Sequence, residues 1–183
     1  MEYLSKEQLD AGLDYVREAP SAAGTVEMVV SRPETDQRLV LDAGEFVVGL
    51  GLAGDNYVER GSARTPDGAA HPEAQVTIMN SRAIDWITSG TKDMWKMAGD
   101  QLLVDFDISE QNLPAGTHLQ VGGAVLEVSA KPHTGCNKFA ARFGQPAALW
   151  VNSPAGKQLK LRGINAMVIA AGTVRPGDSI AKL

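Results

Sequence analysis

The residues with the clearest chemical potential lie between Lys131 and Gly144, in the run KPHTGCNKFAARFG. This run holds the only cysteine of the chain, Cys136, three residues after His133. A thiol at a helix N-terminus among cations is favoured as the thiolate, the form that attacks sulfur or binds a soft metal ion. The alternative is a buried structural cysteine, because free cysteine is among the most buried residue types. The polar, glycine-containing surroundings favour the reactive thiol.

Two cations follow the cysteine at Lys138 and Arg142, four residues apart, so that on a helix they share one face. Asn137 is predicted to cap this helix and Gly144 to end it. The run contains no Asp or Glu, so its positive charge needs an anion or a thiolate to offset it. We therefore predict an exposed, reactive Cys136 on the floor of a cationic pocket. The alternative is that the cations pair with distant carboxylates and that the thiol is buried.

The composition limits the class of protein. The 183 residues suit one domain with a sizeable core, and a net charge of −5 gives no general attraction to nucleic acid or to an acidic membrane. One cysteine cannot form an internal disulfide, and no cysteine pair is present for structural zinc or an iron–sulfur cluster. The charged N-terminus and the lack of an apolar run of ~20 residues predict neither a signal peptide nor a membrane span. We expect a cytoplasmic protein without nucleic acid or membrane partners.

Short elements joined by turns must position the cysteine. A helix is predicted over about 6–18 from the capping-box spacing of Ser5 and Gln8, a second after Asn80, and a short third over 147–152. The Gly122-Gly123 pair predicts a tight hairpin that leads into the cysteine run. Strands are predicted over 25–32, 38–41, 46–50, 76–79, 101–108, 117–121, 124–130, 160–170 and 179–182. About nine short strands with few helices predict a mainly β (α+β) fold, a closed or nearly closed barrel of mixed strands.

Two other stretches have a functional and a structural interpretation. GLGLAG places Gly49, Gly51 and Gly54 in a formal GxGxxG match, but Gly and Pro follow where the dinucleotide motif needs a helix. We therefore predict turns and no NAD or FAD site. Residues 59–73 are predicted to be a solvated connector, with a lid role left open. This loop carries three basic residues, Arg60, Arg64 and His71.

One long run has a family resemblance. The segment GDQLLVDFDISEQNLPAGTHLQVGGAVLEVSAKPHTGCNKFAARFG, followed by LRGINAMVIAAGTVRPGD, resembles the MOSC domain, the C-terminal domain type of molybdenum cofactor sulfurases. The resemblance extends from about residue 26 to the C-terminus and is most specific over 99–178. It implies a β-barrel similar to the pyruvate-kinase β-barrel domain, with a few short peripheral helices. Residues 1–25 are then an N-terminal helix and lead-in, and residues 26–183 a single MOSC barrel domain.

The resemblance also implies a chemical role for Cys136. In MOSC proteins the functional cysteine either carries persulfide sulfur to a metal–sulfur centre or coordinates molybdenum in a bound molybdopterin. His133 is the second catalytic candidate, and His133 and Asn165 are expected near the metal. The basic residues expected to hold the pterin phosphate are Arg82, Lys138, Arg142 and Arg162.

Four functions remain open. Three share the site: a sulfur carrier or sulfurtransferase, a molybdenum-cofactor-dependent reductase of N-hydroxylated compounds, and a non-catalytic module for molybdopterin binding and delivery. The fourth, a Cys–His hydrolase, is disfavoured because Cys136 and His133 lie on one loop and no third orienting residue is evident. The chain lacks the pyridoxal-phosphate (PLP) domain and the cluster cysteines of larger relatives, so the resemblance implies a stand-alone, bacterial-type module that binds no PLP itself. Its partner would be a PLP-dependent cysteine desulfurase or an electron-donor protein.

Overall fold

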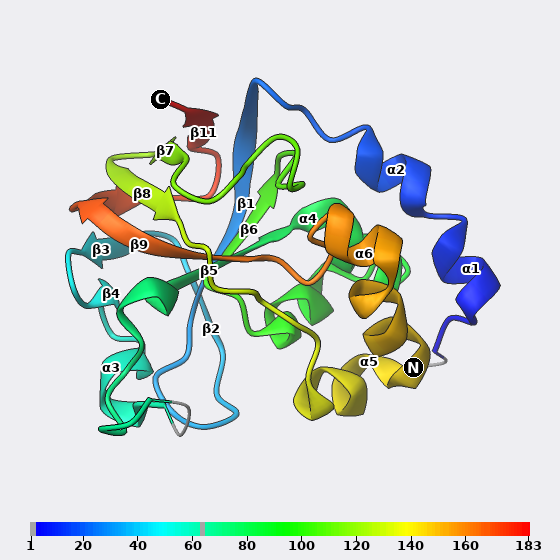
Figure 1. Cartoon of the computed structure of the whole chain (residues 1–183), viewed down its shortest axis with the longest axis horizontal. Coiled ribbons are helices and arrows are strands. Elements are labelled where there is room, and N and C mark those ends of the chain that lie inside the picture. Colours follow the sequence, from blue (N-terminus) through cyan, green and yellow to red (C-terminus); the bar gives the residue numbers. More distant parts are fainter. Residues whose placement is uncertain (1–2, 63–64) are drawn as a thin grey trace.

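The structure is a computed structural model that describes residues 3–62 and 65–183. Arg64 of the predicted polar loop lies outside these residues. Within them, eleven strands and six α-helices form a barrel with helices gathered mainly on one side (Figure 1). In the part of the chain so described, no helix combines the length and the apolar character of a membrane span.

Seven strands close into a barrel, because the first and last of them also pair with each other. Around the barrel their order is β11 (Ser179–Lys182), β7 (His118–Val121), β8 (Ala124–Val128), β9 (Ile164–Ala170), β5 (Val76–Asn80), β6 (Leu102–Asp105) and β1 (Ala23–Ser31), and β1 pairs with β11. All of these neighbours are antiparallel except β5 and β6. The closed barrel of mixed strands confirms the predicted fold class.

Four further strands lie outside this ring. β2 (Leu39–Leu41) pairs with the C-terminal part of β1, while β3 (Gly44–Val47), β4 (Gly51–Leu52) and β10 (Gly172–Val174) form a separate three-stranded sheet. Gly49 and Gly54 lie in the turns that flank β4, as predicted, whereas Gly51, also predicted in a turn, is the first residue of this strand. The element that follows is α3 (Tyr57–Arg60), a single helical turn. The predicted hairpin is also confirmed, with Val121 opposite Ala124.

A bulge in β1 divides its apolar residues between two cores. Simple alternation predicts Val26, Met28 and Val30 on one face, but the pairing with β6 shifts register between Val26 and Met28. An extra residue in one strand moves the following side chains to the opposite face. Val26 and Val29 consequently pack inside the barrel, whereas Met28 and Val30 belong to the core beneath the helices.

The helices cover one side of the barrel and enclose this second core. They are α1 (Lys6–Asp10), α2 (Leu13–Arg17), α4 (Ser81–Ile87), α5 (Asn137–Asn152) and α6 (Pro154–Gln158), and they lie together on the right of Figure 1. Two 3-10 helices, η1 (Pro72–Ala74) and η2 (Lys92–Ala98), complete the set. Phe139 and Phe143 of α5 pack in the second core with Leu9 of α1, so this core holds α5 in place.

Three predicted elements differ from the structure for identifiable reasons. The helix expected over 6–18 is divided because the indole Nε1 of Trp86 donates to the carbonyl of Gln8, and the Gly12 N–H turns to Leu9 instead. The turn expected at residues 153–156 is the start of α6, because the Ser153 hydroxyl caps the helix and Pro154 occupies its first position. Strand β9 therefore begins only at Ile164, after α6 has ended.

Candidate functional site

Cys136 stands at the N-cap of α5 with its thiol exposed. Its backbone is extended (φ −117°, ψ 176°), and the thiol makes no capping hydrogen bond. The predicted exposure is therefore confirmed, and the buried structural alternative is wrong. Asn137, predicted as the cap, is instead the first helical residue, and Gly144 forms a kink inside α5 at φ 87°.

Asn152, at the far end of α5, holds the residue before the thiol. Its Oδ1 accepts a hydrogen bond from the Gly135 N–H at 3.0 Å, and its Nδ2 donates to the Gly135 carbonyl at 3.2 Å and to the Ala148 carbonyl at 2.9 Å. A Cβ on Gly135 would come within 2.9 Å of Asn152 Nδ2 and of Val151 Cγ2, so the clamp requires glycine. We refer to these contacts as the Asn152 clamp; they fix the backbone that presents Cys136.

His133 belongs to a buried charged group beside this loop. Nη1 of Arg162 donates to Oδ2 of Asp100 at 2.7 Å, and Nη2 donates to the Ala98 carbonyl at 3.2 Å. The guanidinium also lies 5.0 Å from the centre of the Phe139 ring. Nε2 of His133 lies 3.2 Å from Oδ1 of Asp100, within ion-pair distance but at an angle unsuited to a hydrogen bond, and both atoms are without a hydrogen-bond partner among the described residues.

Burial and charge set the protonation of this group. Burial, the largest single influence, would raise the pKa of Asp100, but Arg162 and the neighbouring His133 together outweigh it, and the carboxyl pKa lies below its ordinary value. Burial, followed by the positive charge of Arg162, lowers the pKa of His133 despite the nearby carboxylate. The imidazole is therefore neutral at neutral pH, and Arg162 is the cation that keeps Asp100 ionised.

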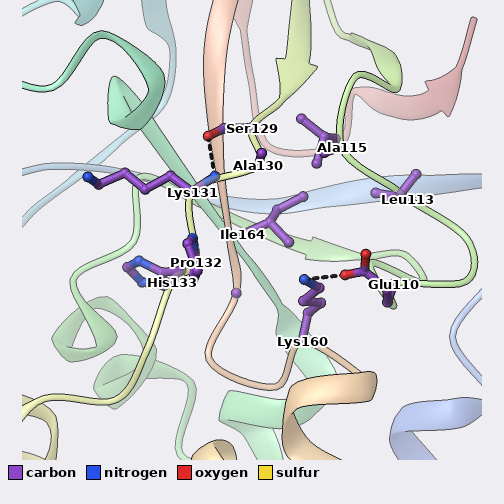
Figure 2. Close-up of a pocket in the computed structure, with 12 residues that line it drawn as sticks. Glu110, Leu113, Ala115, Ser129, Ala130, Lys131, Pro132, His133, Lys160 and Ile164 are labelled. Carbon is purple, nitrogen blue, oxygen red and sulfur yellow. Dashed lines mark hydrogen bonds and ion pairs between the residues drawn. The ribbon is translucent and has the colours of Figure 1, made fainter.

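Two cavities flank the segment from Lys131 to Thr134, and His133 lines both. The first, of about 190 Å³, has Lys131 and His133 on one side and the Lys160–Glu110 ion pair on the other (Figure 2). The second, of about 390 Å³, has three basic residues in its lining, Lys157, Lys160 and Arg162, but much of its surface is apolar and includes Pro132 and Val151. A small polar molecule therefore has room on either side of His133.

Three other predicted site residues, Arg142, Lys138 and Asn165, lie in two different surroundings. Arg142 and Lys138 meet the carboxylate of Asp36, at 2.9 and 3.9 Å. The Asn165 side chain donates to the Lys131 carbonyl at 3.0 Å and supports the backbone that leads to the cysteine.

Arg82 lies apart from these residues. Its guanidinium is paired with Asp105 at 2.7 Å and lies 5.4 Å from the centre of the Tyr15 ring, near the start of α4. The hydrogen bonds of Arg82 go to Asn80, Asp105 and Tyr15, and none goes to residues 131–144. Its role as a phosphate ligand stays a prediction.

Three arginines converge on three successive carbonyls at the end of η2. The carbonyls of Met97, Ala98 and Gly99 accept hydrogen bonds from Arg142 (3.0 Å), Arg162 (3.2 Å) and Arg32 (3.0 Å), respectively. Arg32 is itself held by Asp55 in a buried, bidentate pair at 2.8 and 2.9 Å. Sequence reasoning missed Arg32 and Asp100, because their pairings join distant parts of the chain. The cysteine loop thus lies beside a turn that three arginines hold, each of them paired with a carboxylate.

This fold and this cysteine loop define a class of protein. The family model for the MOSC domain matches residues 65–181, more than half of the chain, and the chain belongs to the MOSC domain family. The match includes the Cys136 loop, both cavities and the η2 turn.

Several solved structures share this fold. The YuaD protein from Bacillus subtilis superposes with a TM-score of 0.59 and 19% sequence identity, over 86% of this chain and 94% of that chain. YiiM from Escherichia coli gives a TM-score of 0.55 and 21% identity, over 87% of this chain and 69% of that chain. YiiM from Geobacillus stearothermophilus gives a TM-score of 0.56 and 15% identity, over 88% of this chain and 75% of that chain. At these identities the likeness shows the fold alone. Among curated proteins, none matches the sequence.

Proposed function

We propose that this MOSC protein carries sulfane sulfur on Cys136 for transfer towards a metal–sulfur centre. The observation that carries the proposal is the exposed thiol at the N-cap of α5, which has no structural hydrogen bond of its own. Its loop is nevertheless fixed by the Asn152 clamp. A free thiol on a fixed backbone suits a residue that accepts and releases sulfur repeatedly.

The sulfur-transfer step is balanced without an added oxidant or reductant. The Cys136 thiolate attacks the outer sulfur of a donor persulfide, a new S–S bond forms on Cys136, and the donor leaves as its thiolate. The same exchange in the opposite sense passes the sulfur to an acceptor thiolate. We assign to His133, which is neutral at neutral pH, the role of accepting the proton that the Cys136 thiol loses when the thiolate forms. Asp100 and Arg162 act as its positioning residues.

The donor in this proposal is another protein, a PLP-dependent cysteine desulfurase, and both act in the cytoplasm. An exposed thiol can meet a protein-bound persulfide without a deep active-site cleft. The cationic cavity beside His133 and Arg162 supports recognition of an acidic donor surface.

A second candidate function is binding of the molybdenum cofactor, either for reduction of N-hydroxylated compounds or for cofactor delivery. No group of three His, Cys, Asp or Glu residues suited to a metal occurs in the described ranges, so Cys136 would be the single soft protein ligand. Arg142 and Lys138 would hold the cofactor phosphate, with Arg162 and Asn165 supporting the loop. These residues fit the group. When bound, the cofactor would supply two-electron chemistry at molybdenum, and an electron-donor protein would be the partner.

The test of sulfur carriage is mass spectrometry of the intact protein after incubation with a cysteine desulfurase and cysteine. We expect one added sulfur atom on Cys136 in the wild type and none in Cys136→Ser. Because the thiol is exposed, this substitution should leave the fold unchanged, which circular dichroism would check. Wild-type protein that acquires no sulfur under these conditions would rule out carriage. Molybdenum and pterin fluorescence co-purifying with the same protein would then favour the second candidate.

A further inference from the structure

Two further cavities are both lined by Asp85 of α4. One, which we call the acidic cavity, has a volume of about 320 Å³ and is lined by three carboxylates and two aromatic rings, those of Glu27, Asp85, Asp105, Tyr15 and Trp95. The other, which we call the apolar groove, has a volume of about 470 Å³ and is lined by Leu4, Ala11 and Trp86 beside Asp85. Neither shares a lining residue with the two cavities that flank residues 131–134. Both volumes suit a small-molecule ligand.

Two of the three carboxylates of the acidic cavity hold a cation of the protein itself, and each cation also faces an aromatic ring. The two groups are Arg82 with Asp105 and the Tyr15 ring, and Lys92 with Glu27 and the Trp95 ring. A carboxylate beside an aromatic face is a combination that attracts ammonium and guanidinium groups. The three carboxylates meet only these two cations, so the cavity keeps an excess of negative charge.

Asp85 is the carboxylate that lacks a cation. Among residues 3–62 and 65–183 no basic side chain lies within ion-pair distance of it, and its one side-chain hydrogen bond comes from the Tyr15 hydroxyl at 3.5 Å. Ser81, which is only 3% exposed, lines the same cavity, and its hydroxyl has no hydrogen-bond partner in the same part of the chain. A buried hydroxyl without a partner costs free energy. A ligand that donates to Ser81 and carries a positive charge would satisfy both side chains.

The spacing of the carboxylates and the surface of the groove narrow the kind of cation. In the described residues, no three His, Cys, Asp or Glu side chains lie close enough together to hold a metal ion, so these carboxylates suit a larger cation. The groove on the other side of Asp85 presents the hydrocarbon of Leu4 and Trp86. Burial of a ligand's hydrocarbon there would be favourable.

We propose that the acidic cavity and the apolar groove together bind a small organic cation, an ammonium compound with an apolar chain. The ammonium group donates to the Asp85 carboxylate and to the Ser81 hydroxyl, and the chain lies in the groove against Trp86. Charge selects the ligand at one end and apolar surface selects it at the other. The site uses no residue of the cysteine loop and adds a binding function to sulfur carriage.

Titration calorimetry with n-hexylammonium chloride at constant ionic strength tests the site. We expect the wild type to bind it with a Kd of about 1 mM, in keeping with the size of the ligand. Asp85→Asn should weaken binding about tenfold because a charged hydrogen bond is lost, and Ser81→Ala about threefold because a neutral one is lost. The matched control is Asp14→Asn on α2, an exposed carboxylate whose loss makes the same change in net charge and should leave binding unchanged.

Two further probes separate the charged end of the ligand from its chain. Neutral 1-hexanol should bind the wild type about tenfold more weakly than n-hexylammonium, and it should bind Asp85→Asn as it binds the wild type. n-Butylammonium should also bind about tenfold more weakly, because two methylene groups fewer are buried.

The proposal is overturned if the wild type does not bind n-hexylammonium, or if Asp85→Asn binds it as tightly as Asp14→Asn does. None of these titrations involves Cys136. Binding that is weakened in Asp85→Asn would therefore support the site even if sulfur carriage fails, and absent binding would overturn the site while sulfur carriage could still hold.

Discussion

Oδ1 of Asp100 lies 3.2 Å from Nε2 of His133, and the other oxygen of the same carboxylate accepts a hydrogen bond from Arg162. This arrangement supplies the orienting residue that the sequence does not reveal for His133. Because the carboxylate faces Nε2, that nitrogen is the one expected to carry the proton of the neutral ring. The other ring nitrogen is then free to accept a proton.

Stability should fall as the pH is lowered below about 6.5. His133 has a lowered pKa in the folded protein, so the unfolded chain takes up a proton at the ordinary value of about 6.5 before the folded protein does. The stability contribution is complete above that value and is lost as the pH falls through the folded pKa. Asp100, also lowered, adds a second loss below its ordinary value of 3.8. Urea unfolding from about pH 8 to about pH 5 measures the effect.

The control for this pH dependence is His133→Gln, which keeps a polar side chain but cannot titrate. As the pH falls, the wild type should lose stability relative to His133→Gln. The free energy of unfolding of the wild type minus that of the variant should therefore decrease. A difference that stays constant over this range would mean that His133 is not held neutral by its surroundings.

Asp100→Asn should destabilise the protein by about 3–5 kcal/mol, because it leaves the buried guanidinium of Arg162 without its counter-charge. Arg162→Met removes the guanidinium and keeps much of its volume. The double variant should therefore be less destabilised than the sum of the two single variants. Urea unfolding of all four proteins gives the coupling, and strictly additive losses would show that the two residues do not depend on each other.

Asn152→Ala should impair the positioning of the Cys136 thiol while leaving the thiol exposed. The substitution removes three hydrogen bonds, so acceptance of sulfur from the desulfurase should fall about tenfold, because a reacting group is misplaced. Iodoacetamide labelling, which needs only an exposed thiol, should change little. Asn112→Ala is the matched control, since Asn112 also bonds two backbone carbonyls, those of Ser21 and Asp107. Equal sulfur acceptance in the two variants would contradict the role of the clamp.

Gly51→Ala should be more destabilising than Gly49→Ala by more than about 1 kcal/mol. Both glycines have positive φ, 83° and 80°, so the backbone strain is similar. Only at Gly51 would a Cβ also meet a backbone atom, the Gln75 carbonyl oxygen at 2.6 Å. Thermal unfolding of both variants measures the difference. We expect no NAD binding, and micromolar NAD affinity that is lost in Gly51→Ala would overturn the interpretation of this run as turns.

The barrel could be predicted because its signals are local. The Gly122-Gly123 turn fixes one hairpin by itself, and short apolar runs between glycines and prolines mark the strands. The features that differ from the predicted fold depend on contacts from elsewhere in the chain. The bulge in β1 is defined by its pairing with β6, and the break between α1 and α2 depends on Trp86, which no local pattern near Gln8 reveals.

The candidate site shows the same difference between local signals and long-range contacts. Residue type and spacing single out Cys136 and His133 as candidates, and their roles stay predictions. Asp100 and Asn152 could not be found in this way, because each acts on a residue far away in the sequence, through a fold that brings the two together. The expectation for Arg82 rests on its charge, and the structure pairs that charge with Asp105. Charge predicts that a residue has a partner, but not which one.

The seam between β1 and β11 has a consequence for synthesis of the chain. Ala23 pairs with Ala181, so the ring joins its first strand along the chain to its last. While Ser179–Lys182 is still inside the ribosome, β1 has one unpaired edge and so does β7. A nascent chain therefore carries two open strand edges until translation has passed this strand, and it needs protection from edge-to-edge association during that interval.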